Sequence, residues 1–239
     1  MLILGLDFET TGFDFAKDRI IEIGAVLWDT EHRVPMEMMS ALIHWPDNEL
    51  LTPEITAITG ITDEMLAVHG VDFLSSWAEM HDLMRNAEAI VAHNGTGFDK
   101  PMYEAHCGRW SLTPAELPWI DTCIDVPYPP AITTRKLVHL AAEHGFLNPF
   151  AHRAVFDVLT MLRVLDQYDI AEVLESAKQP SLMVRAIVSY DDREKAKARG
   201  YRWDAGTKTW RKPLKAHRLE EERLAMEAER MGLEVIDPA

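Results

Sequence analysis

Acidic residues occur at three places along the chain where their spacing suits metal-assisted chemistry. The first pair, Asp7 and Glu9, ends an apolar run that begins at Met1. Alternate side chains of a β-strand share a face, so the two carboxylates point the same way. Side by side at the end of a buried strand, they repel each other and are costly to remove from water. A divalent cation between them removes both problems, because Mg²⁺ and Mn²⁺ prefer oxygen ligands.

Two later segments each supply another carboxylate. In HNGTGFD, residues 93–99, a strand end and a glycine-rich turn place Asp99 in the first turn of a helix, close to the edge of the sheet. In HRAVFD, residues 152–157, the histidine and the aspartate are separated by about 500° of helical rotation and do not stack on one face. We therefore expect His152 at or just before a helix start and Asp157 inside the helix, which suits a mobile base and a metal-binding aspartate.

The apolar pattern predicts the elements that hold these residues. Strands are expected at 1–6, 20–28, 36–45, 89–92 and 119–124, and helices at 73–86, 98–107, 135–144 and 152–175. The first three strands indicate an antiparallel meander, and the later alternation of helices and strands indicates an α/β domain with a mixed sheet. Glu22 interrupts the second strand, and is either an acid beside the site or a hydrogen-bonded structural residue.

The acidic segments resemble the motifs of the DnaQ-like 3′→5′ exonucleases of the DEDDh group, which includes the proofreading subunit of bacterial replicative polymerase, exonuclease X and RNase T. The first motif, D-x-E-T-T-G, matches residues 7–12, and the third, H-x-A-x-x-D, matches residues 152–157. The second motif, usually H-N-x-x-F-D, is one residue longer here, and Asp99 takes the place of its aspartate. The resemblance covers about residues 1–175.

This resemblance implies a ribonuclease-H-like fold over residues 1–177, with a mixed five-stranded sheet flanked by helices. It also implies a two-metal site with Mg²⁺ or Mn²⁺, whose ligands and catalytic groups are Asp7, Glu9, Asp99 and Asp157. His152 would take a proton from the attacking water, a task that suits the near-neutral pKa of histidine. The implied reaction is hydrolysis of single-stranded or frayed 3′ DNA to nucleoside 5′-monophosphates.

The resemblance further assigns substrate contacts near the carboxylates. The turn formed by Thr10, Thr11 and Gly12 would hold the terminal nucleotide, and Asn94 is expected beside it. Ile61 would wedge against the terminal base, although ordinary core packing explains this residue equally well.

The charge of the chain is unevenly distributed. Residues 1–177 carry a net charge of −18, residues 178–218 carry +8, and residues 219–239 carry −5, which gives −15 in total. After a linker at 178–181, the pattern predicts a small basic α+β module over residues 182–239. Its cations and aromatics suit phosphates and unpaired bases, and the candidate contacts are Arg202, Trp203, Lys208, Trp210 and Arg211. The alternatives are a small aromatic core with a solvated basic face, or a surface that docks a protein.

Other classes of function remain open or are disfavoured at this point. One alternative is a 3′→5′ exoribonuclease of the RNase T or oligoribonuclease type, and another is an inactive nucleic-acid-binding or polymerase-associated subunit. The complete carboxylate set favours an active enzyme. No apolar run is long enough to span a bilayer, and the N-terminus lacks a signal-peptide pattern. We expect a cytoplasmic protein that acts on single-stranded 3′ ends, DNA rather than RNA, with a polymerase or another replication or repair partner and no membrane.

Overall fold

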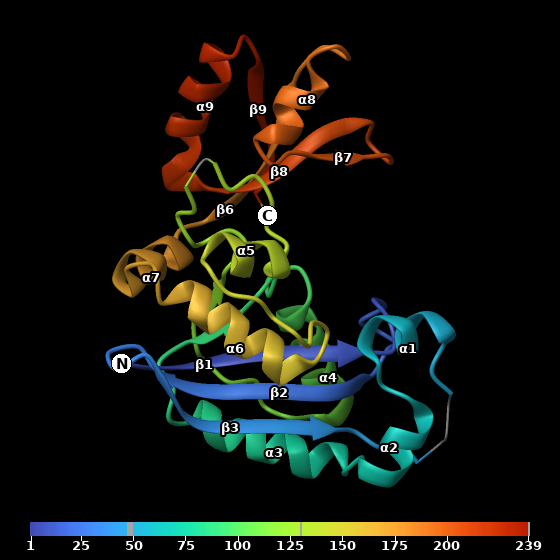
Figure 1. Ribbon diagram of the computed structural model, residues 1–239. Helices are drawn as coiled ribbons and strands as arrows, with labels where there is room; N and C mark the ends of the chain where they lie inside the picture. The colour runs from blue at the N-terminus through green and yellow to red at the C-terminus, as the bar shows by residue number, and fades with distance from the viewer. Residues whose placement is uncertain (47–49, 130, 239) are drawn as a thin grey trace.

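The computed structural model describes residues 1–46, 50–129 and 131–238, which form two sheets with their helices (Figure 1). The main sheet contains β1 (Leu2–Thr10), β2 (Ile20–Asp29), β3 (Val34–Leu42), β4 (Ile90–Ala92) and β5 (Trp119–Asp121), in the order β3-β2-β1-β4-β5. The first three strands pair antiparallel, and β4 pairs parallel with both β1 and β5. This arrangement confirms the mixed five-stranded sheet that the sequence predicts.

Helices cover both faces of the main sheet. They are α1 (Pro53–Thr59), α2 (Asp63–His69), α3 (Phe73–Met84), α4 (Asp99–Trp110), α5 (Leu137–Glu143), α6 (Ala154–Leu165) and α7 (Ile170–Lys178). Leu4, Leu6 and Phe8 of β1 pack into a core with residues of α3 and α4. Ile3 belongs to the opposite core with residues of α5, α6 and α7. The alternation of side chains along β1 therefore separates two apolar layers.

Two glycines allow α6 to lie close against the sheet. A Cβ on Gly5 of β1 would lie 2.6 Å from Cγ1 of Val158, and a Cβ on Gly24 of β2 would overlap the backbone of Ala154. Both glycines lie on the same face as Asp7, because Asp7 is paired with Gly24 in the antiparallel register. The missing side chains bring the start of α6 onto the strand that carries the first two carboxylates.

The single long helix predicted at 152–175 is wrong, because the chain forms α6 and α7 with a turn at 166–169. Asp169 caps α7 by accepting the backbone N–H of Ala171 at 2.9 Å. Asp166 accepts the indole N–H of Trp28 at 3.1 Å, across 138 residues of sequence. The break thus depends on a local cap and a distant contact. The helix α1, which begins at Pro53, is not among the helices that the sequence predicts.

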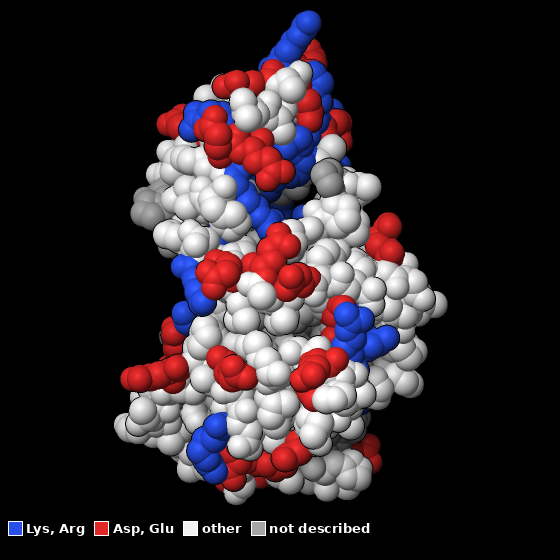
Figure 2. Space-filling model, turned by 90° about the vertical axis from the view of Figure 1, so that its left-hand side faces the viewer, with Lys and Arg blue, Asp and Glu red and all other residues white. Residues whose placement is uncertain are grey.

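The C-terminal part forms a small α+β unit, as the sequence predicts. It contains β6 (Ser181–Ile187), α8 (Arg193–Ala198), β7 (Arg202–Asp204), β8 (Thr209–Lys215), a 3₁₀ turn (Ala216–Arg218), α9 (Leu219–Ala228) and β9 (Gly232–Pro238). Its sheet has the order β7-β8-β6-β9. Ala239, the last residue of the predicted module, lies outside the described residues. In Figure 2 most Lys and Arg side chains lie in the upper part of the molecule, at the height of this sheet.

The connection between the two sheets is short and hydrogen-bonded. Helix α7 ends at Lys178 and β6 begins at Ser181, so the predicted linker at 178–181 is reduced to two residues. The backbone N–H of Ala216 donates to the carbonyl of Pro180 at 2.9 Å. Among the described residues, no helix is both long and apolar enough to cross a membrane.

Candidate active site

Asp7 and Glu9 lie at the carboxyl end of β1 on the face that α6 covers. Asp7 is paired with Gly24, and Glu9 is paired with Glu22, in the register with β2. Strand β1 continues to Thr10 rather than ending near Leu6, so both carboxylates are held by regular strand pairing. Each carboxylate is partly buried. Their positions are therefore fixed by the central strand of the molecule.

Asp99 reaches the same strand from the opposite face. It is the first residue of α4, its side chain is buried, and its Oδ1 accepts the backbone N–H of Phe8 at 3.1 Å. Asn94 adopts a left-handed conformation with φ of 63°, and its carbonyl accepts the N–H groups of Gly97 and Phe98 at 3.0 Å. This turn includes the extra residue of the second motif and places the Asp99 carboxylate against the backbone of Phe8, the residue between Asp7 and Glu9.

The third segment meets β1 at the start of α6. His152 precedes the helix with φ of 63°, and its backbone N–H donates to Oδ2 of Asp157 at 2.9 Å. The side chain of Asn148 donates to the other oxygen of Asp157. One possible ligand atom from each of Glu9, His152 and Asp157 lies within 4.8 Å of the others. The structure therefore brings the three acidic segments to one edge of the sheet.

Glu22 fits both of its alternatives, because it lies beside the site, paired with Glu9, and is also hydrogen-bonded as a structural residue. Its carboxylate is fully buried and accepts from Nη2 of Arg153 at 2.9 Å and from the backbone N–H of Ala154 at 3.0 Å. These bonds satisfy the N-terminal end of α6, where an acidic group is also favoured by the helix dipole. Glu22 thus fixes the segment between His152 and Asp157, and its interruption of an apolar strand was the sequence signal for it.

The carboxylates oppose one another's ionisation. Burial raises the pKa of Asp7 well above its usual range, and Asp99 and Glu9 raise it further. Burial, followed by Asp157 and Glu22, raises the pKa of Glu9 to about 8. Burial raises the pKa of Asp99 to about 8, and it also raises the pKa of Asp157. A group of hard oxygen donors that cannot all be charged without compensation fits a divalent cation.

The hydroxyl groups of the turn after β1 are used within the turn. Oγ1 of Thr10 donates to the carbonyl of Gly12 at 2.7 Å, and Oγ1 of Thr11 donates to Oδ1 of Asp18 at 2.8 Å. A Cβ on Gly12 would overlap the Asp18 carboxylate. The threonine hydroxyls therefore shape the turn, and a side chain at position 12 would have to displace the Asp18 carboxylate.

The predicted contact of Ile61 with a base is corrected by the structure. The Ile61 side chain is fully buried and packs with Ile21 and Leu66. It has no exposed surface for a base, and core packing is the alternative that holds.

Phe13 is a candidate that sequence reasoning missed. Its side chain is 79% exposed, and its ring lies edge-on to Phe98, with the ring centroids 5.6 Å apart. Nη2 of Arg109 donates to the carbonyls of Phe15 and Asp18 at 3.1 and 2.7 Å, which holds the loop that carries Phe13. An aromatic residue placed directly after the D-x-E-T-T-G turn was the available signal.

The predicted contacts of the module lie on its hairpin, away from the carboxylates. Arg202 and Lys208 are exposed, whereas Arg211 pairs with Asp204 at 3.1 Å. Trp203 and Trp210 lie opposite each other across β7 and β8, with ring centroids 5.7 Å apart. Trp203 is 53% exposed, whereas Trp210 packs against the module core.

Arg202 lies near the main sheet as well. Burial raises the pKa of Cys123, just after β5, to about 12, and Arg202 opposes this rise. Arg202 is therefore close enough to the loop after β5 to interact electrostatically with Cys123.

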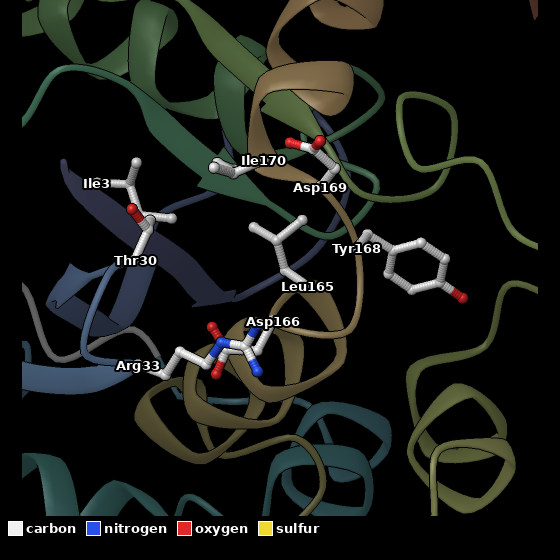
Figure 3. Close-up of a pocket in the computed structure, with 8 residues that line it drawn as sticks. All are labelled: Ile3, Thr30, Arg33, Leu165, Asp166, Tyr168, Asp169 and Ile170. Atoms are coloured by element: carbon white, nitrogen blue, oxygen red, sulfur yellow. The ribbon is translucent and has the colours of Figure 1, made fainter.

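A pocket of about 280 Å³ lies at the opposite end of β1 and contains none of the predicted site residues (Figure 3). Its walls come from the start of β1, the turn after β2 and the connection between α6 and α7. The lining residues are Ile3, Thr30, Arg33, Leu165, Asp166, Tyr168, Asp169 and Ile170. We assign it no part in the chemistry at the carboxylates.

Comparison with known proteins gives the family. The model of a family described as exonuclease matches residues 4–165, and the model of a domain of unknown function matches residues 182–231. The PolC-type DNA polymerase III of Mycoplasma genitalium is 28% identical over 161 residues, which cover 66% of this chain but 11% of that protein. The epsilon subunit of DNA polymerase III from Treponema pallidum is 32% identical over 154 residues, 63% of this chain and 68% of that subunit.

Solved structures agree on the fold. The match to E. coli exonuclease I in complex with a dA16 oligonucleotide covers 82% of this chain and 50% of the exonuclease I chain, with a TM-score of 0.62 and 19% identity. The nuclease domain of 3′hExo bound to rAMP, a DEDDh family member, matches 70% of this chain and 90% of its own, with a TM-score of 0.58 and 18% identity. Together with the family match over residues 4–165, these findings show that the chain belongs to the family of DnaQ-like 3′→5′ exonucleases.

Proposed function

We propose that this protein removes nucleotides one at a time from single-stranded or frayed 3′ ends of DNA and releases nucleoside 5′-monophosphates. The observation that carries the proposal is the convergence of four carboxylates and one histidine at the carboxyl end of β1. We also propose two domains, an exonuclease domain at 1–177 and the accessory module at 182–239. The family membership supports the reaction class.

Two Mg²⁺ or Mn²⁺ ions would be held by Asp7, Glu9, Asp99 and Asp157. When bound, such cations favour ionisation of the attacking water and stabilise charge on the scissile phosphate. The raised pKa values of Glu9 and Asp99 support this assignment, because burial and neighbouring carboxylates leave negative charge to be compensated. Asp7 interacts electrostatically with Asp99, Glu9 and Asp157, and is the expected shared ligand.

His152 would act as the general base. Its side chain is exposed on a turn before α6, and a ring nitrogen lies within reach of the Glu9 and Asp157 carboxylates. A histidine in this position accepts a proton from the attacking water and passes it to solvent. The Glu22–Arg153 ion pair behind it keeps the start of α6 fixed while the histidine ring moves.

Substrate would bind at two places, near the carboxylates and on the C-terminal module. Phe13 would stack on the terminal base, because a large exposed ring that packs against Phe98, the residue before Asp99, offers a surface to any base. Beside it, the turn of Thr10, Thr11 and Gly12 and the neighbouring Asn94 would shape the place of the terminal nucleotide.

The module would bind the strand further from the scissile bond. Arg202 and Lys208 would meet phosphates, and Trp203, Trp210 and Arg211 would form the surface around them. These contacts would compensate for the acidic main domain.

DNA is favoured because the curated relatives are DNA polymerase proteins. A polymerase partner and a cytoplasmic location are proposed on the same ground. A 3′→5′ exoribonuclease is the second candidate, supported by the fold likeness to the rAMP-bound nuclease domain of 3′hExo.

The test is a degradation assay with 5′-labelled single-stranded DNA and RNA of one sequence. Mg²⁺, Mn²⁺ and EDTA are compared for the wild type, for Asp7→Asn, and for the control Asp29→Asn at the far end of β2. We expect a metal-dependent ladder that shortens from the 3′ end and is lost only in Asp7→Asn. The faster substrate decides between DNA and RNA. Binding without cleavage in either metal would refute the proposal.

A further inference from the structure

We propose that the C-terminal module positions the loop that carries Asp99, through a buried connection from Lys215 to Asp125 and from Asp125 to Asp121. The inference rests on the proposed function, in which Asp99 is a metal ligand. It gives the module a role in turnover that differs from holding substrate. Lys215 is a positioning residue in this account, because it touches neither substrate nor metal.

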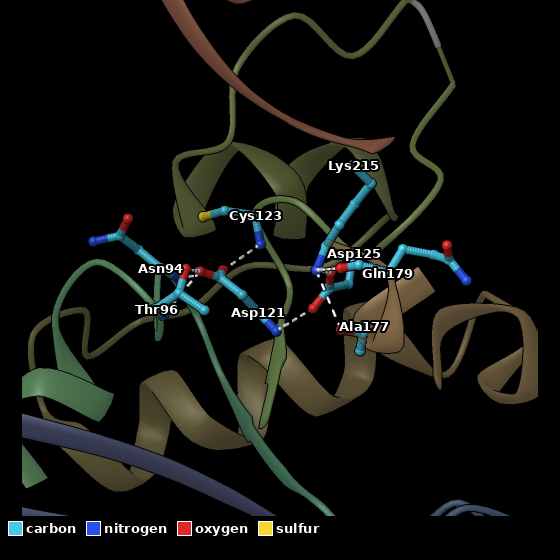
Figure 4. Close-up of polar contacts among 8 residues, drawn as sticks. All are labelled: Asn94, Thr96, Asp121, Cys123, Asp125, Ala177, Gln179 and Lys215. Carbon is cyan, nitrogen blue, oxygen red and sulfur yellow. Dashed lines mark hydrogen bonds and ion pairs between the residues drawn. The ribbon is translucent and has the colours of Figure 1, made fainter. Parts of the chain in front are cut away.

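The connection begins with a buried ion pair. Lys215 ends β8 and is 5% exposed, and its Nζ lies 2.8 Å from Oδ1 of Asp125, which is 1% exposed. The same Nζ donates to the carbonyls of Ala177 and Gln179, at the end of α7, at 3.3 and 3.2 Å (Figure 4). A lysine is rarely buried unless its charge is paired and its donors are used. Lys215 meets both conditions only with groups of the main domain and its last helix.

The connection continues from Asp125 into β5. Oδ2 of Asp125 accepts the backbone N–H of Asp121 at 2.7 Å. The buried carboxylate of Asp121 in turn accepts the backbone N–H groups of Asn94 and Thr96 at 3.0 Å and of Cys123 at 2.9 Å. It also accepts the Thr96 hydroxyl at 2.6 Å. Figure 4 shows these groups as a continuous series between the module and the loop after β4.

The loop held by Asp121 leads directly to the proposed ligand. The backbone N–H of Lys100 donates to the carbonyl of Gly95 at 2.8 Å, which joins the loop to the first turn of α4. Asp99, the first residue of that helix, is tied to β1 by the N–H of Phe8. A displacement of Asn94 or Thr96 therefore changes the position of the Asp99 carboxylate against β1.

The ion pair with Lys215 orients the Asp125 carboxylate. Burial raises the pKa of Asp125, and Lys215 opposes that rise. An ionised Asp125 has one oxygen in the ion pair with Lys215 and accepts the Asp121 N–H with the other, so the ion pair and the hydrogen bond hold its two oxygens on different partners. Without Lys215, a buried carboxylate without a cation would protonate or rotate toward water. Asp121 would then lose the hydrogen bond from its backbone N–H to Asp125, and the loop of Asn94 and Thr96 that Asp121 holds would be less firmly placed.

The experiment replaces Lys215 by methionine in the full chain, with Lys212→Met as the matched control. Lys212 lies on the same strand, but it pairs with Glu222 inside the module at 3.2 Å. Substitution of a residue that orients a metal ligand typically lowers activity by about 10–100-fold. We therefore expect kcat of Lys215→Met to fall at least about tenfold. KM for single-stranded DNA should stay within about twofold, because Lys215 has no surface for substrate.

A second readout needs no metal and no activity. In metal-free protein, hydrogen exchange at the amides of Asn94 and Thr96 should be faster in Lys215→Met and unchanged in Lys212→Met. Equal exchange and equal kcat in the two variants would overturn the inference. A raised KM with unchanged kcat would also overturn it, because it would assign Lys215 to substrate binding.

Two further measurements cover a variant that does not fold. Lys215→Gln keeps N–H donors and loses the charge, and its loop exchange should lie between those of the wild type and Lys215→Met. In wild-type protein in low urea, the amides of Asn94 and Thr96 should lose protection when β8 opens. Loop amides that stay protected after β8 opens would refute the connection. Failure of the proposed function itself is distinct, because it would appear as activity that survives in Asp7→Asn or as wild-type protein that binds DNA without cleaving it, and the exchange of the loop amides would still test the connection.

Discussion

The carboxylate cluster should make the stability of the metal-free protein fall as pH rises. Burial and neighbouring acids raise the pKa of Glu9 and of Asp99 to about 8. An acid whose pKa is higher in the folded state binds more protons folded than unfolded, so unfolding becomes easier as pH rises toward the folded pKa. The contribution of these acids to the free energy of unfolding is therefore fully present below the ordinary carboxyl pKa. It is lost progressively as the pH rises from there to about 8.

The window from about pH 6.5 to pH 8 separates this effect from the titration of the buried histidines. The exposed His32, whose pKa is raised by its hydrogen bond with Asp29, adds a slope of the same sign, and the difference between the wild type and Glu9→Gln removes that contribution. Burial lowers the pKa of His93, and it lowers the pKa of His106 to about 4, so these histidines favour folding increasingly up to their ordinary pKa near 6.5 and add no slope above it. Across this window, Glu9 alone corresponds to a loss of roughly 2 kcal/mol in the free energy of unfolding. Asp99 adds a similar amount at most, because water penetration and relaxation reduce both.

Urea unfolding at several pH values measures this slope, first in EDTA and then in excess Mg²⁺. In EDTA the free energy of unfolding should fall by about 2–4 kcal/mol across the window. Mg²⁺ should cancel most of the fall, because a ligand that binds only the folded state stabilises it more as the carboxylates ionise. Glu9→Gln should remove about half of the slope in EDTA, and the control Glu37→Gln, at an exposed position of β3, should leave it. A flat or rising curve for the wild type in EDTA would refute the electrostatic account of the site.

Three further changes probe the groups around the carboxylates. Phe13→Ala should raise KM for single-stranded DNA by about tenfold with little change in kcat, because base stacking contributes roughly 1–3 kcal/mol; steady-state kinetics test this, and an unchanged KM would remove Phe13 from the site. Glu22→Gln should lower the free energy of unfolding by about 1–3 kcal/mol and kcat by about tenfold, because the buried bond to Arg153 loses its charge; full activity would show that α6 does not need this anchor. Replacing Arg202 and Lys208 by Ala should weaken DNA binding and lower the slope of log K against log salt by about one per lost phosphate contact, and an unchanged slope in a binding titration would remove the module from the substrate path.

The sequence was sufficient for the residues that the local pattern determines. Asp7 and Glu9 follow an apolar run, and Asp157 follows a histidine at a helix start. The strand and the helix that carry these residues could therefore be predicted, and so could their meeting at one edge of the sheet. The hairpin around Asp204 was also predictable, because its side chain accepts the N–H groups of Gly206 and Thr207 within the turn. Such short-range bonds are visible in the order of the residues.

Features that depend on distant partners were not predictable. The break between α6 and α7 involves Asp166 and Trp28, and the Lys215–Asp125 pair joins positions 90 residues apart. Burial of Ile61 depends on its packing with Ile21 of β2 and Leu66 of α2. The sequence shows only that an isoleucine stands at position 61. The close approach of α6 depends on Gly24, whose neighbours in space are far away in sequence. A single sequence contains these residues but not their pairing.

Release of the 3′-terminal nucleotide is the most direct test of the convergent site. Single-stranded DNA labelled on its last nucleotide is mixed with excess enzyme and Mn²⁺, and the first product is identified. The account predicts labelled nucleoside 5′-monophosphate from the wild type and from Asp29→Asn, and none from Asp7→Asn, Asp99→Asn or Asp157→Asn, nor from the wild type in EDTA. Internal cleavage, a labelled oligonucleotide as first product, or activity that survives these substitutions would contradict it.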